Sequence, residues 1–408
     1  YGSRGANGVV LINTKRGKMG KVNINAKVES SYSARTYTPE FVDGYTYASL
    51  LNEARTTRFL EPMYSDEELY LLKTGMDPDL YPSVDWLDVL LRDGAMSYRA
   101  NLDISGGGAT ARYFVSASYV NEGGMYKTDE KLKDYDTNAN YQRWNYRMNV
   151  DMDITKSTLL QLGVSGWLAK RSESGFGEYE IWSAALGYSP INCPVIYSDG
   201  RIPGSGSENE RINPWVATTQ MGYTETWENV IQTNVTLQQN FDFITKGLRF
   251  TGRFGFDTYN YNQRCNQQWP EMWSADRTRD ANGNIVFKRV REQQLMQHFS
   301  SSSGNRKEFF EAILQYDRTF GDHIVGGTFK YAQDMTDDTQ NVSDYNWLSR
   351  KHQGIAGRFT YGWKYRYFLD FNFGYNGSEN FAPGHQFGFF PAYSAAWNIA
   401  EEPLLRIT

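Results

Sequence analysis

The side chains that most often do chemistry are few and scattered in this 408-residue chain. No His-x-x-x-His spacing marks a metal site, and no Gly-x-Ser-x-Gly motif marks a nucleophile. Cys193 and Cys265 have no Cys or His at metal-ligand spacing. The sequence therefore predicts neither a catalytic centre nor a cofactor, and the chain is not expected to be an enzyme. The four histidines are His298, His323, His352 and His385.

Cys193 and Cys265 are the only cysteines, and both lie in polar, turn-rich segments. An oxidising compartment would allow a disulfide between them. We favour two unpaired loop thiols, and the sequence leaves the pairing open.

Three carboxylates, Asp334, Asp337 and Asp338, cluster near the end of a predicted strand. Their oxygen atoms could hold a structural Ca²⁺ ion. The glycine turn and distal glutamate of a calcium loop do not follow, so a solvated loop is the favoured interpretation. Near the N-terminus, Gly2, Gly5 and Gly8 precede a predicted strand and not a helix. They are typical of tight backbone packing and not of a phosphate cradle.

Tryptophans in the long connections are the candidates for contact with a solute. Their rings stand beside Asn, Asp and Arg, and such a mixture suits sugars, which have apolar C–H faces and hydroxyls that need hydrogen bonds. The alternative is that each ring packs inside its own loop. The candidates are Trp182, Trp215, Trp269, Trp273 and Trp347.

Alternation with period two is the main structural pattern. In residues 146–154, apolar side chains occupy the even positions and mostly polar ones the odd positions. The same split recurs in 231–241, 248–257 and 365–375. In a barrel the polar face of each strand points inward. The positions expected to line that interior are Arg147, Asp151, Gln232, Asn234, Arg253, Arg366 and Asp370.

The predicted strands are about ten residues or longer, which matches a tilted membrane-crossing strand. Short turns alternate with long connections, as in outer-membrane barrels. The long connections cover roughly 36–97, 122–143, 172–225, 262–305, 336–351 and 377–387. The twelve predicted strands are 22–35, 98–105, 111–121, 143–153, 158–170, 226–242, 247–261, 306–319, 323–335, 353–363, 365–376 and 387–399.

The first long connection shows helical spacing. Residues 45–54, 65–73 and 85–91 are predicted helices, and Ser65 with Glu68 forms a capping box. We expect a folded lobe over residues 36–97.

The composition supports an all-β protein and limits its partners. The chain has 42 Lys and Arg against 47 Asp and Glu, a net charge of −5, and this excludes a large basic surface for nucleic acid. Aromatic residues make up 15% of the chain, so it is not an intrinsically disordered protein. No stretch approaches 18 consecutive apolar residues, so no transmembrane helix is expected.

Several segments, in order along the whole chain, resemble SusC/RagA-family TonB-linked outer-membrane transporters. Residues 1–17 are similar to the end of the plug domain of that family, residues 77–87 to its region after the first barrel strand, and residues 387–402 to a motif inside its barrel. The residues that carry the plug-end motif are Tyr1, Gly2, Arg4, Gly5, Asn7 and Gly8.

The resemblance implies an antiparallel transmembrane β-barrel fragment, with about 12 of 22 strands and long extracellular loops that contain short helices. Residues 1–20 would be the C-terminal end of the plug, with its last strand at about 9–16. Residues 21–408 would be the N-terminal half of the barrel, and the lobe at 36–97 would be extracellular. The signal peptide, the TonB box, most of the plug and the later strands are expected to lie outside this sequence.

The function implied is TonB-dependent import of a large nutrient across the outer membrane of a Gram-negative cell. The substrate would be an oligosaccharide or, alternatively, a peptide. The partners would be a SusD-like surface lipoprotein, TonB through the missing N-terminal region, and outer-membrane lipid, without nucleic acid. Two other classes stay open: a surface or adhesion barrel without transport, and a secreted β-rich sugar-binding protein.

Overall fold

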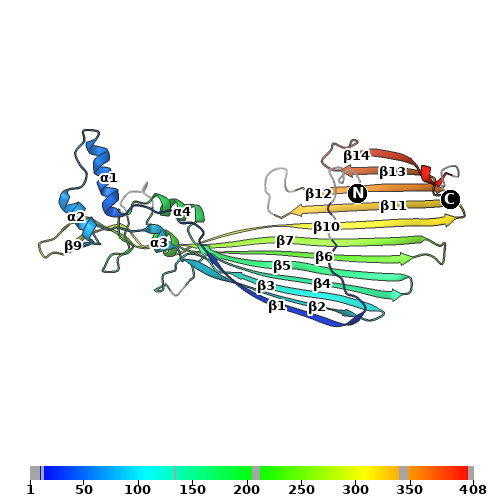
Figure 1. Cartoon of the computed structure of the whole chain (residues 1–408), viewed down its shortest axis with the longest axis horizontal. Helices are drawn as coiled ribbons and strands as arrows, with labels where there is room; N and C mark the ends of the chain where they lie inside the picture. Colours follow the sequence, from blue (N-terminus) through cyan, green and yellow to red (C-terminus); the bar gives the residue numbers. More distant parts are fainter. Residues whose placement is uncertain (1–9, 11–12, 133–134, 205–211, 340–347, 403–408) are drawn as a thin grey trace.

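One antiparallel sheet of twelve strands forms most of the molecule, with a helical lobe at one end (Figure 1). The computed structural model describes residues 10, 13–132, 135–204, 212–339 and 348–402. Apart from one two-stranded insertion, each strand pairs with its neighbours in sequence order. The twelve strands are β1 (Gly20–Ala34), β2 (Gly94–Gly107), β3 (Ala111–Glu122), β4 (Asn140–Thr155), β5 (Thr158–Ser174), β6 (Gly222–Asn240), β7 (Leu248–Gln267), β10 (Gln297–Phe320), β11 (His323–Asp338), β12 (Arg350–Trp363), β13 (Tyr367–Ser378) and β14 (Phe387–Trp397).

All twelve predicted strands are confirmed, with ends that differ by up to nine residues. The largest difference is at β10, which begins nine residues before the predicted start at 306. The hairpin of β8 (Met272–Arg279) and β9 (Ile285–Arg291), inside the connection at 262–305, was not predicted. Of the expected last plug strand, residues 13–16 form no strand, and 9, 11 and 12 lie outside the described residues.

The register gives the sheet two different faces. Asn149, Gly163, Asn234, Gly255 and Phe309 are successive partners across β4, β5, β6, β7 and β10, so they share one face. Most side chains on that face are polar, and we call it the polar face. The opposite face, which we call the apolar face, carries exposed rings and aliphatic chains such as Phe254, Phe329 and Tyr393. Within the described ranges no second large sheet covers these rows, in contrast to a β-sandwich.

Tight turns join the strands at the end away from the lobe. Between β12 and β13, Lys364 and Tyr365 both have positive φ angles, of 53° and 57°. They are the two central residues of a turn that the Arg366 N–H closes by donating to the Trp363 carbonyl oxygen at 2.9 Å, and two consecutive left-handed residues match the twist of the flanking strands. Before β7, Gly247 has a φ of 87°, and a Cβ there would collide with the carbonyl oxygen of Asp317.

The first long connection contains three helices, as predicted: α1 (Gly44–Thr56), α2 (Asp66–Thr74) and α3 (Trp86–Leu90). The capping box is present, since the backbone N–H of Ser65 donates to Glu68 at 2.9 Å and that of Glu68 donates to Ser65 Oγ at 3.3 Å. Two further helices, α4 (Glu178–Gly187) and α5 (Pro214–Thr219), were missed. Of the described helices, none has the length and apolar character to cross a membrane.

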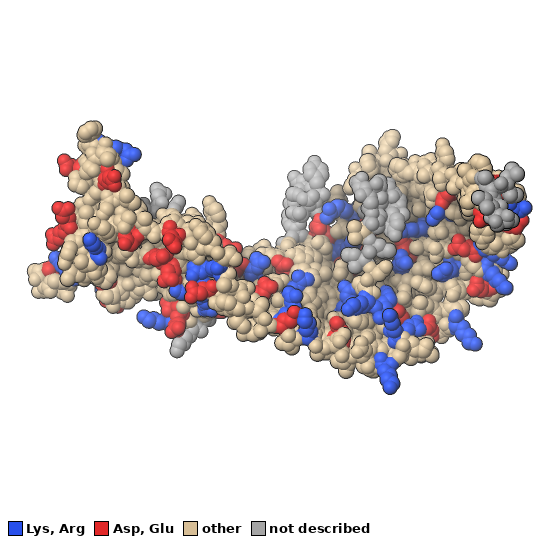
Figure 2. Space-filling model, viewed as in Figure 1, with Lys and Arg blue, Asp and Glu red and all other residues tan. Residues whose placement is uncertain are grey.

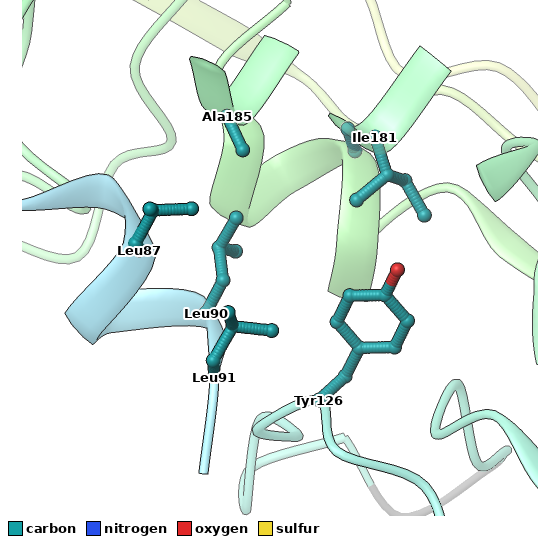
Figure 3. Packing of buried hydrophobic residues seen from close by; sticks show 7 residues of the cluster. Leu87, Leu90, Leu91, Tyr126, Ile181 and Ala185 are labelled. Carbon is teal, nitrogen blue, oxygen red and sulfur yellow. The ribbon is translucent and has the colours of Figure 1, made fainter. Parts of the chain in front are cut away.

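The lobe has its own core, built from three of the connections between strands. Leu87 and Leu90 of α3 face Ile181 of α4, and Tyr126 approaches from the segment between β3 and β4 (Figure 3). Ala217 of α5 completes the cluster. Burial of these apolar side chains is what holds the connections in one folded unit.

Arginines attach the β8–β9 hairpin to the lobe. Arg279 pairs with Asp77 at 2.7 Å, and Arg277 pairs with Glu68 at 3.5 Å. On its other side, the Arg201 guanidinium lies over the rings of Trp273 and Phe287, at 4.7 and 4.2 Å from their centroids. The hairpin is therefore part of the lobe and not a free loop.

Candidate functional site

The N-terminal segment, by which we mean residues 13–19 directly before β1, crosses the polar face of the sheet (Figure 1). Asn149 Nδ2 donates to the backbone oxygen of Lys15 at 2.6 Å, and the Arg16 guanidinium pairs with Asp151 at 2.5 Å. Gln161 holds the same carboxylate with a hydrogen bond of 3.1 Å. Asn149 and Asp151 are consequently buried, at 4% and 7% exposure, although they belong to an otherwise open sheet. The polar face is thus the face that receives the N-terminal segment.

We expect Asp151→Ala to release this segment, because Arg16 loses its carboxylate partner. Loss of a part-buried, charge-assisted contact that contributes about 1.4 kcal/mol corresponds to a roughly tenfold rise in the fraction of molecules in which the N-terminal segment is released. Trypsin cleavage after Lys15, Arg16 and Lys18 should accelerate by about that factor. Asp153→Ala is the control, since Asp153 pairs with Arg112 at 2.6 Å and not with the segment. Equal cleavage of the two variants would contradict the anchoring role.

A buried carboxylate ties together three strands on the polar face. Glu311 of β10 is 3% exposed, accepts from Arg253 of β7 at 2.9 Å and forms an ion pair with Lys330 of β11. Two cations balance one buried anion, as burial of a charge requires.

Next to Glu311, the polar face contains a hollow of about 490 Å³ across β10 to β14. Its floor is the register row that contains Ala332, Gly354, Asn376 and Gly388. The Asn376 amide lies over Gly354 and the Phe390 ring over Gly388, where an added Cβ would collide with them. The adjacent row has two further small residues, Ala356 and Gly374, between Lys330 and Phe390.

The walls of the hollow come from the two neighbouring rows. On one side are Phe309, Asp334 and His352, and the Asp334 carboxylate lies 3.5 Å from the His352 ring. On the other side are Lys330 and Phe390, and the Phe390 ring is 53% exposed. Two aromatic side chains, a floor that combines small residues with the Asn376 amide, and several further hydrogen-bonding groups make this a suitable binding site for a polar ligand with an apolar face.

The predicted interior positions fall mostly on the polar face. Arg253 and Asp370 are engaged in ion pairs there, Arg253 with Glu311 and Asp370 with Arg358. Arg366 lies in the turn before β13 and pairs with Glu402 at 3.6 Å. Contact of any of them with a solute stays a prediction. Those that the register places with Asn149 on the polar face are Arg147, Asp151, Gln232, Asn234, Arg253 and Asp370.

The predicted tryptophans do not form one platform. Trp215 packs into the lobe core, and Trp269 lies under Arg291, whose guanidinium is 3.9 Å from the ring centroid. Trp273 is covered by Arg201, and Trp182 of α4 is 39% exposed. Trp347 lies outside the described residues. Loop packing accounts for Trp215, Trp269 and Trp273, so their role as sugar platforms stays a prediction.

The other candidate residues are placed as follows. The plug-end motif lies outside the described residues. Cys193 and Cys265 form no disulfide with each other: Cys193 is buried beside Tyr188, at 3.4 Å from its hydroxyl, and Cys265 is in β7 and not in a loop.

The three clustered carboxylates turn to different partners. Asp337 pairs with Arg306 at 2.8 Å, Asp338 with Arg350 at 2.7 Å, and Asp334 faces His352. They therefore do not converge on a common cation position.

Phe309, His352, Asn376 and Phe390 were missed as site residues. None belongs to a short motif, because they come together only through the register of five strands. The available signal was the recurrence of Gly and Ala at alternate positions of β11, β12 and β14.

Two tyrosines of the lobe should titrate late. Burial, reinforced by Glu178, raises the pKa of Tyr126 to about 12, against a hydrogen bond with Trp182 that lowers it. Burial, with a contribution from Cys193, likewise raises the pKa of Tyr197 to about 12. Because the unfolded pKa is about 10, the stability from these neutral hydroxyls is complete below pH 10 and is lost as the pH rises to about 12. Tyrosinate absorbance should show a late phase that Tyr126→Phe and Tyr197→Phe remove. An unchanged late phase in both variants would contradict this assignment.

The lobe is strongly acidic. Residues 36–97 contain twelve Asp and Glu against four Lys and Arg, and red acidic side chains dominate the charges on this part of the surface in Figure 2. Because the whole chain has a net charge of only −5, the residues outside 36–97 carry a slight positive net charge. The lobe thus presents a negative potential at the end of the sheet away from the tight turns.

Comparison with known proteins gives relatives over the whole chain. It is 23% identical to TonB-dependent receptor P26 of Formosa agariphila over 426 residues, covering 100% of this chain and 40% of that protein. It is also 23% identical to TonB-dependent receptor SusC of Bacteroides thetaiotaomicron, again over 100% of this chain and 40% of the relative. No protein-family model matches the sequence.

The fold is similar to that of solved transporters. A structure described as the RagAB peptide transporter aligns with a TM-score of 0.66 and 17% identity, covering 99% of this chain and 47% of the other. A structure of the RagAB peptide importer in its 'open-open' state aligns with a TM-score of 0.67 and 18% identity, with the same coverage. The chain spans about two fifths of the length of the curated relatives it matches. The comparisons confirm the resemblance to SusC/RagA-like TonB-dependent receptors, a class of Gram-negative outer-membrane proteins whose members found here are receptors and transporters and not enzymes.

Proposed function

We propose that this chain is part of a TonB-dependent importer that carries a large nutrient, an oligosaccharide, across the outer membrane. The observation that carries the proposal is the two-faced sheet. Its apolar face exposes rings and aliphatic chains suited to lipid, while its polar face receives the N-terminal segment. A wall of this kind, with a segment held on its inner side, fits a plugged barrel.

Residues 1–20 would be the end of the plug and residues 21–408 the first half of the barrel wall. The ion pair of Arg16 with Asp151 would then join plug to wall. A pull transmitted by TonB to the plug would act against this contact and the neighbouring bond from Asn149 to Lys15. Both contacts are polar, so water entering an opening lumen can replace them at low free-energy cost.

The helical lobe would stand at the extracellular mouth and meet a SusD-like lipoprotein. In support, the SusC relative carries the name of that system, and the lobe is a folded unit with its own core rather than a set of separate loops. A rigid lobe loses little conformational entropy when a partner docks.

Peptide import by the same fold is the second candidate, because the aligned RagAB structures are described as a peptide transporter and importer. A barrel that serves adhesion without transport would have little use for a segment anchored on the polar face.

Uptake by cells that express the complete protein tests the proposal. We expect a labelled oligosaccharide to enter wild-type cells and not cells that lack TonB. Labelled peptides, supplied in parallel, distinguish the second candidate. Uptake that persists without TonB would refute the importer assignment for either substrate.

A further inference from the structure

We propose that the hollow across β10 to β14 binds a neutral oligosaccharide segment on the inner side of the barrel wall. This inference deepens the proposed function and rests on it, because it needs the polar face to line a passage. The volume of about 490 Å³ lies within the range of roughly 300–1,000 Å³ found for small-molecule sites. The strands build most of the hollow, and Phe381, His385 and Gln386 of the connection between β13 and β14 complete its lining.

The shape of the hollow suits sugar rings. The floor is Ala332 together with the Asn376 amide, which lies over Gly354, and the Phe390 ring, which lies over Gly388. Phe309 and Phe390 belong to the rows on opposite sides of the floor row, and an aromatic face is a good contact for the C–H face of a pyranose. Their separation by the floor row lets one ring rest against each wall.

The polar groups of the hollow suit a neutral ligand. Asp334 lies beside His352, and Lys330 is paired with Glu311, so cations and anions here offset one another. A ligand with a net charge would meet no matching excess of opposite charge. Hydroxyl groups, which both donate and accept, can join these groups and the Asn376 amide without disturbing the pairs.

A peptide fits the same groups less well. Peptides most often bind to sheets by adding a strand at an edge, where backbone N–H and C=O groups are unsatisfied. Of the strands under the hollow, β11, β12 and β13 are each paired on both sides, so their backbone groups are already used, and β14, the edge of the described sheet, would pair with the next strand in a complete barrel. A peptide in the hollow would leave much of its own backbone to water or to a few side chains.

The test is binding to the complete transporter, purified in detergent. The probes are fluorescent neutral oligomers of glucose, mannose, galactose and xylose with three to six units, with uronic-acid oligomers and mixed tetrapeptides in parallel. Phe390→Ala removes one wall, and Ala332→Phe fills the floor. Phe389→Ala is the matched control, because this neighbour is similarly exposed, at 57%, but belongs to the apolar face.

We expect at least one neutral oligomer to bind, with affinity lowered at least about tenfold by Phe390→Ala and by Ala332→Phe. Phe389→Ala should change it less than about twofold. Since Phe390 is exposed, its replacement should leave the melting temperature nearly unchanged, which separates lost contact from lost folding.

Three results would overturn the inference. The first is equal binding of neutral oligomers to all variants, and the second is the failure of every neutral oligomer to bind. The third is binding of a tetrapeptide that is lost in the Phe390→Ala variant. If TonB-dependent uptake persists in any of these cases, the hollow is refuted while the importer assignment stands. TonB-independent uptake would refute the importer assignment instead.

Discussion

Without detergent, the 408-residue chain on its own is expected to sediment as large assemblies with no detectable monomer. Two features of the structure cause this. Strands β1 and β14 are the edges of the sheet and have one side without a partner strand among the described residues. The apolar face adds exposed rings along several strands, including Phe254, Phe359 and Phe389.

Analytical ultracentrifugation with and without detergent checks this expectation. Detergent should cover the apolar face but not the edges, so it should shift the distribution toward small oligomers. A monodisperse monomer in plain buffer with a sharp, reversible melting transition would show that the apolar face is not a lipid-facing surface.

Replacement of Glu311 by Ala is expected to lower the free energy of unfolding by roughly 2–3 kcal/mol. Removal of one member of a buried ion pair costs about 3–5 kcal/mol when the remaining charge stays buried. Here the remaining charges are Arg253 and Lys330, which are partly exposed and can turn toward water. The expected cost therefore lies below that range.

Urea unfolding of the complete protein in detergent measures this cost. Asp370→Ala is the control, because its partner Arg358 is largely exposed and such pairs contribute less than about 1 kcal/mol. In the double variant Glu311→Ala and Arg253→Ala, part of the loss should be recovered, since one unbalanced cation is gone. Equal stabilities of the Glu311 and Asp370 variants would show that Glu311 is not the centre of the cluster.

The sheet could be predicted from the sequence because the information is local. Strict alternation, as in residues 146–154, fixes both the strand and the face of each side chain. The β8–β9 hairpin lacks a long alternating row and is held by distant arginine contacts, such as Arg279 with Asp77. The start of α5 could have been recognised, since Asn213 caps the helix and Pro214 is its first residue. α4 has no side-chain cap at Gly177, so no comparable start signal was present.

The hollow could not be predicted, because it depends on which residues of five strands become neighbours. A shift of one residue in the register would move Phe309 or His352 to the other face. The tryptophans show the opposite problem. Their type suggested ligand contact, but Arg201 and Arg291 cover two of them, and the contact of Arg201 with Trp273 joins two different connections.

The lobe core has a consequence for how such proteins diversify. Leu90, Tyr126 and Ile181 come from three different connections between strands, yet they fill one shared volume together with Ala217, which belongs to the same connection as Ile181. A larger residue in one connection therefore demands a smaller one in another, so these surface segments should co-evolve rather than drift independently. Grafting a single connection from a relative should fail, whereas exchange of all three together should succeed.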